Sequence, residues 1–335
     1  MDRLVNSLLL IIVSLILITG CSSREAEYDT LPKAGVAIYN FSDTYMSSIR
    51  STINSYSKGK INLEIVDSQN SQQLQNDKVD SFISKNYTAM AVSTVDRNAA
   101  GAIIQKAQEA NIPVIFINRE PLADVLYKWE KAYYVGAKAE ESGTKQGEIV
   151  VDYWYNHAWM DKNNDGIMQY VMLKGEPGHQ DAELRTRYSI LAIEEAGIPT
   201  EALVVDTAMW NRLKGQEKMA SFIQIYGDKI EAVLANNDDM ALGAIEALKQ
   251  AGYFNNGRII PVVGVDALEP AVKAVQEGTM IGTVYTNAEN QAKATVELMR
   301  VLAAGEVPTQ ENIGYEITDG KYIWIPYQKL TANNQ

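Results

Sequence analysis

Short apolar runs alternate with longer amphipathic segments from residue 34 almost to the end of the chain. The runs are rich in β-branched residues and predict strands. These strands are Ala34–Tyr39, Ile61–Val66, Ala89–Val95, Pro113–Ile117, Ala132–Val135, Tyr170–Leu173, Ala202–Val205, Ala232–Ala235, Ile260–Val265 and Ile281–Tyr285. The segments between them repeat apolar residues with a helical period. They predict helices such as Tyr45–Ser57, Ala99–Ala110, Ala182–Ala196, Met240–Ala251 and Gln291–Leu302.

The alternation of strands and helices indicates the fold class. It favours right-handed βαβ units and parallel sheets that carry helices on both faces. About ten strands in one chain predict an α/β fold of two doubly wound parallel-sheet lobes. In such sheets, ligands bind in the crevice beyond the carboxyl ends of the strands. The residues that follow the predicted strands are therefore the candidate functional residues.

The N-terminus carries a separate apolar segment. Leu8–Ile18 is eleven residues long, which is shorter than the roughly 20 residues that span a bilayer but typical of the apolar core of a signal peptide. It leads into Ile18-Thr19-Gly20-Cys21, which resembles the lipobox of bacterial lipoproteins. We predict a signal peptide over 1–20, lipidation at Cys21 and a tether over 21–33, so that the protein is exported and lipid-anchored outside the cytoplasmic membrane. A buried N-terminal helix with an incidental cysteine explains the pattern less well.

Composition excludes several classes of protein. The chain has 335 residues, with 30 Lys and Arg against 42 Asp and Glu and a formal net charge of −12. A field of that sign repels phosphate backbones, so we expect no nucleic-acid partner. Cys21 is the only cysteine, and His157 and His179 are the only histidines. Disulfide scaffolds, His-rich zinc sites and Cys–His nucleophilic pairs are therefore excluded.

The predicted strand ends carry planar polar groups and aromatic rings. These residues include Asp43, Asn118, His179, Asp181, Trp210, Asn237, Asp266, Thr286 and Asn287. Sugars require this mixture, because each hydroxyl both donates and accepts hydrogen bonds while the C–H face of the ring packs on a flat apolar surface. Any single Asp or Asn is better explained as a helix cap or turn. The recurrence at seven strand ends favours a binding site.

Several long segments resemble one family. They are KAYYVGAKAEESG, VMLKGEPGHQDAE, VVDTAMW, LANNDDMALGAIEAL, VVGVDAL and NQAKAT, and the resemblance runs from about Gly35 to Tyr327. The chain is similar to the periplasmic galactose- and glucose-binding proteins of ABC sugar transporters. This resemblance implies a type I periplasmic binding protein-like fold, with two lobes joined by a three-stranded hinge. The first lobe would comprise 34–136 plus 287–319, and the second 137–286 plus 320–335.

The resemblance also implies the ligand, the partners and the residues of the site. D-Galactose or D-glucose would be enclosed between the lobes of a monomer and delivered to an ABC permease. Tyr45, where the family has phenylalanine, and Trp210 would stack on the sugar. The polar shell would consist of Asp43, Asn118, His179, Asp181, Arg185, Asn237 and Asp266. Thr286 stands where the family has asparagine, and Asn287 follows it, so one contact departs from the family pattern.

A calcium loop is the second candidate site. Asp161-Lys-Asn-Asn-Asp-Gly-Ile-Met-Gln169 matches the first nine positions of an EF-hand loop, with oxygen ligands expected from Asp161, Asn163, Asp165, the Ile167 carbonyl and Gln169. Position 12 is Met172 and the next segment reads as a strand, so an EF-hand is excluded. The resemblance implies that Glu231 supplies the missing carboxylate. We predict structural Ca²⁺, against the alternative of a metal-free polar turn.

Three other functions are compatible with parts of the sequence. A glycoside hydrolase would need two carboxylates facing one glycosidic bond, and the strand ends are instead rich in Asn, Arg and aromatics. A transcription regulator would need a basic N-terminal helix-turn-helix, where this chain has the apolar segment. A sugar-sensing subunit for a chemoreceptor or sensor kinase shares the binding chemistry and remains an alternative to transport. We therefore expect a binding protein and not an enzyme.

Overall fold

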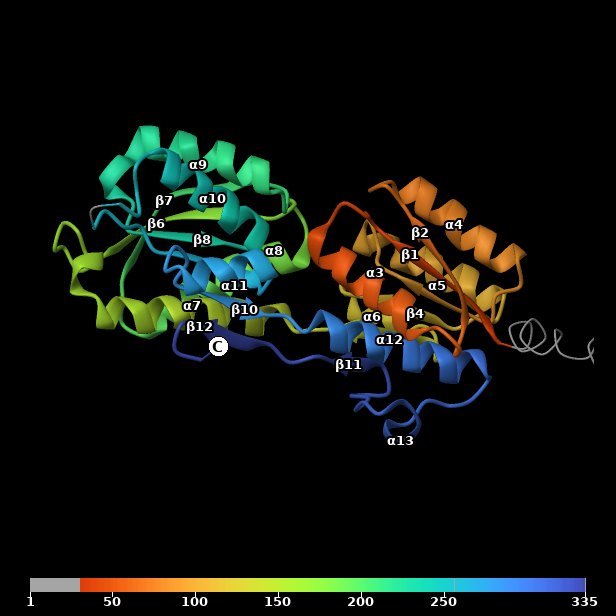
Figure 1. Cartoon of the computed structure of the whole chain (residues 1–335). Helices are drawn as coiled ribbons and strands as arrows, with labels where there is room; N and C mark the ends of the chain where they lie inside the picture. The colour runs from red at the N-terminus through yellow and green to blue at the C-terminus, as the bar shows by residue number, and fades with distance from the viewer. Residues whose placement is uncertain (1–30, 256, 335) are drawn as a thin grey trace, which may run out of the picture.

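The computed structural model describes residues 31–255 and 257–334 and forms two α/β lobes, which lie side by side in Figure 1. The predicted signal peptide and Cys21 lie outside the described residues. No helix in the described part of the chain is long and apolar enough to cross a membrane.

The first lobe contains a six-stranded sheet in the order β11-β5-β4-β3-β1-β2, whose recorded strand pairs are all parallel. Its strands are β1 (Lys33–Ile38), β2 (Asn62–Asp67), β3 (Ala89–Val92), β4 (Val114–Ile117), β5 (Ala132–Gly136) and β11 (Tyr322–Trp324). Its helices are α3 (Thr44–Tyr56), α4 (Gln72–Ser84), α5 (Ala100–Glu109), α6 (Ala123–Leu126), α12 (Ala288–Ala303) and α13 (Gln310–Ile313), with the short η1 (Arg97–Ala99).

The second lobe repeats this plan with the order β12-β10-β9-β8-β6-β7, in which only β12 runs antiparallel to its neighbour. Its strands are β6 (Met168–Lys174), β7 (Thr200–Thr207), β8 (Ala232–Ala235), β9 (Val262–Asp266), β10 (Gly282–Tyr285) and β12 (Gln328–Thr331). Its helices are α7 (Ala139–Asn156), α8 (Gln180–Glu195), α9 (Arg212–Tyr226), α10 (Asp238–Gln250) and α11 (Glu269–Gln276), with the short η2 (Ala158–Met160) and η3 (Gly227–Lys229).

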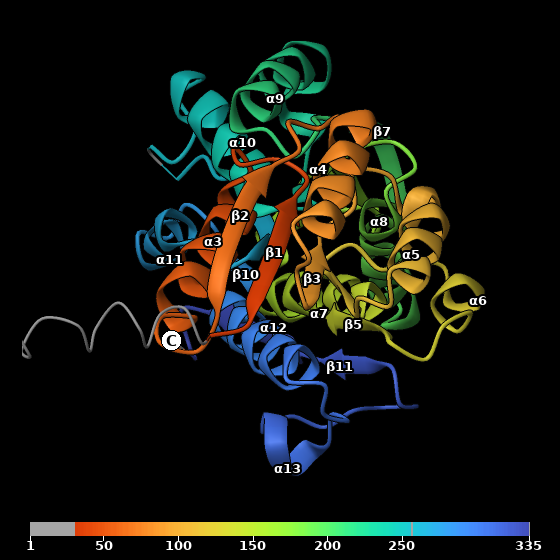
Figure 2. The same cartoon turned by 90° about the vertical axis from the view of Figure 1, so that its right-hand side faces the viewer.

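Each sheet has a hydrophobic core on both faces. In the first lobe, α3 and α12 cover one face while α4 and α5 cover the other, as Figure 2 shows. In the second lobe, α9, α10 and α11 cover one face while α7 and α8 cover the other. Burial on both faces explains why the central strands read as continuous apolar runs and not as alternating ones. The two doubly wound lobes predicted from the sequence are therefore confirmed.

Three crossovers join the lobes, and the last differs from our prediction. The first two follow β5 and β10, near the predicted positions. We placed the third at residue 320, but Tyr322, Ile323 and Trp324 pair with β5 and belong to the first lobe. The chain crosses only between Trp324 and Gln328. The predicted boundary was wrong because this short strand is stabilised by pairing at the edge of the sheet, which has no local signature in the sequence.

Candidate functional site between the lobes

The carboxyl ends of the strands of both sheets face a cavity of about 40 Å³ between the lobes. Nine of the eleven residues predicted to contact a sugar line it: Asp43, Tyr45, Asn118, His179, Asp181, Arg185, Trp210, Asn237 and Asp266. Because a buried water needs roughly 10–15 Å³, the cavity has room for a few water molecules. A hexose could enter only if the lobes separate. The lobes also contact each other beside the cavity, through Arg119–Glu176 and Gln180–Glu120 hydrogen bonds, so the structure represents a closed arrangement.

Helix N-termini position much of the polar shell. Asp43 caps α3 by accepting from the backbone N–H of Met46 at 2.7 Å, and Asn237 caps α10 by accepting from that of Met240 at 3.0 Å. His179 caps α8, since its Nδ1 accepts from the backbone N–H of Asp181 at 3.1 Å. Each residue therefore serves as a helix cap and also lines the cavity. For these side chains, the role of a helix cap and the role of a cavity wall apply together.

Arg185 is the centre of the charged network. Its guanidinium donates to Oγ of Ser142 at 3.1 Å, to the carbonyl of Asn236 at 2.9 Å and to Oδ2 of Asp181 at 3.3 Å. Its Nη1 also lies 3.9 Å from Oδ1 of Asp266. Five fixed donors in one plane are suited to holding several oxygens at once. The network leaves the buried carboxylates oriented toward the cavity.

Burial changes the protonation of the lining groups. It raises the pKa of Asp266 well above its ordinary value, although the positive charge of Arg185 opposes this shift. It also raises the pKa of Asp181, again against Arg185. The pKa of His179 is lowered well below its ordinary value by burial and by the charges of Arg119 and Arg185. The ring is therefore neutral at pH 7, and because Nδ1 accepts a hydrogen bond, its proton is on Nε2.

The two aromatic residues come from opposite lobes. Tyr45 lies in the first turn of α3, and Trp210 precedes α9 with a positive φ of 60°. The Trp210 ring packs over Gly175, where an added Cβ would lie only 2.0 Å from the ring. Only glycine at 175 permits this close approach. The aromatic pair and the polar groups together match the apolar face and the hydroxyls of a sugar ring.

Thr286 and Asn287 do not line the cavity. Asn287 instead caps α12, where its side chain accepts from the backbone N–H of Asn290 at 2.9 Å. The Thr286 hydroxyl is buried and has no hydrogen-bond partner within the described part of the chain. The backbone N–H of Thr286 donates to the carbonyl of Asp266 at 3.4 Å, which places Thr286 next to a residue of the cavity. Its contact with a ligand stays a prediction.

Sequence reasoning missed four residues of this region. Tyr39 and Arg119 line the cavity, and both stand at strand ends, so the rule that found their neighbours could have found them. The Tyr39 hydroxyl donates to Oδ2 of Asp43 at 2.5 Å, and the Arg119 guanidinium lies 3.5 Å from the centre of the Tyr39 ring. The other two residues lie outside the cavity and hold its walls: Gln291 accepts a hydrogen bond from Tyr45, and Tyr327 accepts one from Arg185. No local motif marks these two, because they approach from distant segments.

Two hydrogen bonds cross between the lobes beside the cavity. Arg119 Nη2 of the first lobe lies 3.0 Å from Glu176 Oε2 of the second. Gln180 Nε2 of the second lobe donates to Oε2 of Glu120 in the first, also at 3.0 Å. Both pairs exist only when the lobes are together, so they contribute to the stability of the closed form.

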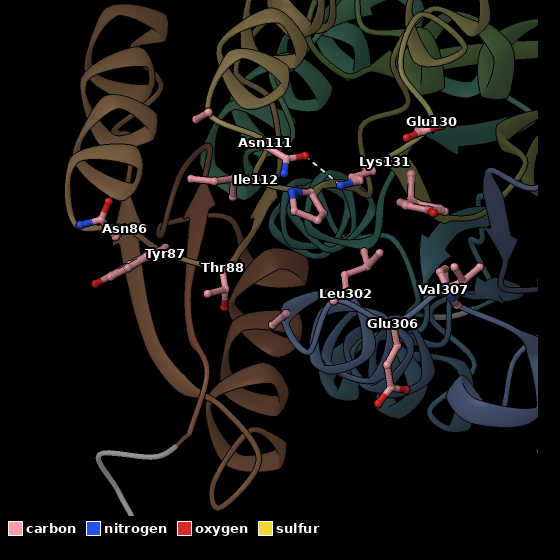
Figure 3. Close-up of a pocket in the computed structure, with 16 residues that line it drawn as sticks. Asn86, Tyr87, Thr88, Asn111, Ile112, Glu130, Lys131, Leu302, Glu306 and Val307 are labelled. Carbon is pink, nitrogen blue, oxygen red and sulfur yellow. Dashed lines mark hydrogen bonds between the residues drawn. The ribbon is translucent and has the colours of Figure 1, made fainter.

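A larger cavity of about 660 Å³ lies at the opposite pole of the first lobe and is shown in Figure 3. It is formed where β3, β4 and β5 begin, and Lys131 donates to Oδ1 of Asn111 at 2.8 Å on its wall. Ligands of open parallel sheets bind at the carboxyl ends of the strands. The smaller cavity between the lobes is therefore the candidate site.

The predicted calcium loop connects η2 to β6, so it enters a strand as expected and not a helix. Glu231 is buried and accepts from the backbone N–H groups of Lys162 at 2.6 Å and of Gln169 at 3.0 Å. Asp161 accepts from the backbone N–H of Gly166 at 2.9 Å. Burial raises the pKa of Glu231, and the negative charges of Asp161 and Asp165 raise it further. Glu231 thus bridges the two ends of the loop that carries Asp161 and Asp165.

The amide ligands have a different arrangement. Asn163 Nδ2 and Gln169 Nε2 donate to Oδ2 of Asp165 at 2.8 and 2.9 Å. Over residues 31–255 and 257–334, no group of three or more His, Cys, Asp or Glu side chains is arranged to hold a metal ion by itself. A cation would therefore also need the amide oxygens, which requires both amides to rotate. The residue types are those that hard Ca²⁺ prefers as ligands.

The fold and site define a two-lobed binding protein that closes around a small polar ligand. A family model described as "Periplasmic binding protein domain" matches residues 34–306, and the chain belongs to this family. It is 41% identical over 315 residues to the D-galactose/methyl-galactoside binding periplasmic protein MglB of Haemophilus influenzae, covering 93% of each chain. It is 28% identical to a xylitol-binding protein of Mycolicibacterium smegmatis, over 86% of this chain and 76% of that one.

A solved structure supports the same family and fold. An ABC transporter solute binding protein from Bacillus halodurans with bound myo-inositol superposes with a TM-score of 0.75 at 29% identity. The match covers 90% of this chain and 95% of that one. The predicted family and fold class are confirmed.

Proposed function

We propose that this protein captures a hexose, D-galactose or D-glucose, between its lobes and delivers it to an ABC permease. The cavity between the lobes is the observation that carries this proposal, because it brings together nine side chains selected for sugar chemistry. Its walls offer carboxylates, amides, a guanidinium and two aromatic rings, which is the complement of a sugar ring. The Haemophilus influenzae relative is a D-galactose/methyl-galactoside binding protein, which supports galactose as the ligand, and the Bacillus halodurans protein is an ABC transporter solute binding protein, which supports an ABC permease as the partner.

Binding and release require a change between open and closed lobes. The sugar would contact groups from both lobes, so it binds the closed arrangement more tightly than the open one and shifts the population toward it. The permease would then recognise the closed form. Members of this family bind substrates and do not transform them, and Arg185 engages two of the carboxylates that a hydrolase would need.

Titration calorimetry against a panel of monosaccharides tests the ligand. We expect saturable binding of D-galactose or D-glucose, and weaker or no binding of pentoses and polyols. Arg185→Lys should weaken binding strongly, because one ammonium cannot replace a planar set of five donors. Arg187→Lys, on the exposed side of the same helix, is the matched control. Binding of neither hexose at millimolar concentration would exclude the assignment.

We also propose that the loop of residues 161–169, together with Glu231, binds Ca²⁺. The observation that supports this is that the negative charges of Asp161 and Asp165 raise the pKa of the buried Glu231, an effect that a divalent cation would relieve. The ion would be structural, because it would join the loop to the residue that precedes β8.

Cys21 would carry a lipid anchor that holds the exported protein at the membrane, and mass spectrometry of the mature N-terminus tests this.

A further inference from the structure

A second cavity of about 340 Å³ lies between the lobes, directly beside the first. Arg119, His179 and Asp181 line both cavities, so the two spaces are separated by single side chains. We call the second space the side cavity. It persists in the closed form, and its volume falls within the range of about 300–1,000 Å³ that is usual for ligand pockets.

The polar atoms around the side cavity point to a neutral, hydroxyl-rich occupant. Nε of Arg97, Nε of Arg119 and Oε1 of Gln180 are buried and have no hydrogen-bond partner among residues 31–255 and 257–334. Two of these atoms are donors and one is an acceptor. A hydroxyl both donates and accepts, so a hydroxylated group satisfies such a mixture, whereas an alkyl or aryl group leaves it unsatisfied.

The charge and the small apolar area of the side-cavity lining further restrict the class of ligand that it can bind. The lining contains four carboxylates (Asp96, Glu120, Glu176 and Asp181) against the two guanidinium groups of Arg97 and Arg119. A ligand that carries its own carboxylate or phosphate would therefore be repelled. Val95 and Pro177 are the main apolar side chains of this cavity, which is little surface for an aromatic substituent. The side cavity is thus suited to a second sugar ring.

His179 allows a glycosidic oxygen to join a sugar ring in the hexose cavity to a second sugar ring in the side cavity. Its Nδ1 already accepts the backbone N–H of Asp181, so the neutral ring has its proton on Nε2 and can only donate there. Arg119, the second side chain on the boundary, is also only a donor. A glycosidic oxygen has no proton and can only accept. Of the three side chains on the boundary, His179 and Arg119 therefore donate to either a free hydroxyl or a glycosidic oxygen, while Asp181 accepts from a neighbouring hydroxyl.

We propose that the protein also binds neutral disaccharides, with one ring in the cavity between Tyr45 and Trp210 and the second ring in the side cavity. This inference rests on the hexose-binding function proposed above and extends its substrate class.

Calorimetry of the full chain with D-galactose, D-glucose, lactose, melibiose and cellobiose tests the inference, with phenyl β-D-galactoside as the aromatic comparison. We expect at least one disaccharide to bind within tenfold of the better hexose and more tightly than the phenyl glycoside. Hexose binding without any disaccharide binding would overturn the inference and leave the proposed function intact. If no ligand binds, both fail.

Variants of the side cavity locate the second ring. Asn98→Trp fills the cavity and Arg97→Met removes a donor; both residues line the side cavity and neither lines the hexose site. Each should weaken disaccharide binding at least fivefold and leave hexose affinity within twofold, while the matched control Arg187→Met changes neither. Unchanged disaccharide affinity in both variants would place the second ring elsewhere and overturn the inference. Hexose affinity also reports whether each variant is folded.

Discussion

The hydroxyl of Tyr45 donates a hydrogen bond of 2.8 Å to Oε1 of Gln291 and so joins α3 to α12. Both residues are buried, and Nε2 of Gln291 donates in turn to the carbonyl of Val135 at 3.0 Å. The chain therefore fixes one aromatic wall of the hexose site to the helix that follows the second crossover. The family's phenylalanine has no hydroxyl with which to make this bond.

Because of this bond, we predict that Tyr45→Phe lowers the stability of the protein but changes its affinity for a hexose only slightly. The change leaves the Gln291 oxygen buried without a donor, so the free energy of unfolding should fall by about 1–3 kcal/mol. Hexose affinity should change less than threefold, because the flat ring remains. Denaturant unfolding and calorimetry measure the two effects, with Tyr127→Phe on the surface as the control. A large loss of affinity with unchanged stability would show that the hydroxyl faces the sugar.

Asp238 predicts an unusual dependence of stability on pH. Its buried carboxylate accepts from the Thr283 hydroxyl at 2.7 Å and from the backbone N–H of Leu268 at 2.8 Å. It thereby anchors the turn after Asp266 and Ala267, whose φ angles are 121° and 54°. Burial raises the pKa of Asp238 from 3.8 to about 7. The folded state thus binds the proton more tightly than the unfolded state.

The sign of the effect follows from this raised pKa. The contribution of Asp238 to stability is fully present below the unfolded pKa of 3.8 and is lost as the pH rises through about 7. Asp238→Asn has no such proton, so its stability relative to the parent should increase between pH 4 and pH 8. Unfolding curves at several pH values measure this difference, and Asp77→Asn is an exposed control. Parallel pH profiles for the parent and Asp238→Asn would contradict the prediction.

Much of this site was predictable because its residues follow strands. Parallel strands bring their carboxyl ends to one edge of their sheet, so Asn118 could be placed near Asp43 in the first lobe, and Asp266 near Asn237 in the second, without any structure. Arg119 stands beside Asn118 and was missed only because the strand-end rule was applied to one residue. Gln291 could not be predicted, since its partner Tyr45 lies far away in sequence. The same holds for β11, which is stabilised by pairing with β5 and not by its own composition.

Removal of calcium should lower thermal stability. The ion would bind the folded loop and not the unfolded chain, so it stabilises the protein by mass action. Excess chelator should lower the melting temperature of metal-loaded protein by several degrees, and the loss should be absent in Asp161→Asn. Glu231→Ala should reproduce most of the loss, but Glu231 also accepts two backbone N–H groups. Asp161→Asn is therefore the cleaner variant, with Asp152→Asn on α7 as its control. An unchanged melting temperature in chelator would exclude the ion.

Thr286 provides the last prediction, because its hydroxyl is buried without a partner in the residues the structure describes. Thr286→Val keeps the branched shape and removes only this hydroxyl. In the free protein the change should leave stability equal or slightly raised, since a buried unsatisfied group is removed. If the hydroxyl bonds the sugar, directly or through water, affinity should fall by about 0.5–1.5 kcal/mol. Thr295→Val is the control, because that hydroxyl is already bonded to the Gln291 carbonyl at 2.8 Å. Unchanged affinity for both hexoses would show that Thr286 is not a ligand, and Asn287 would then be the residue to substitute.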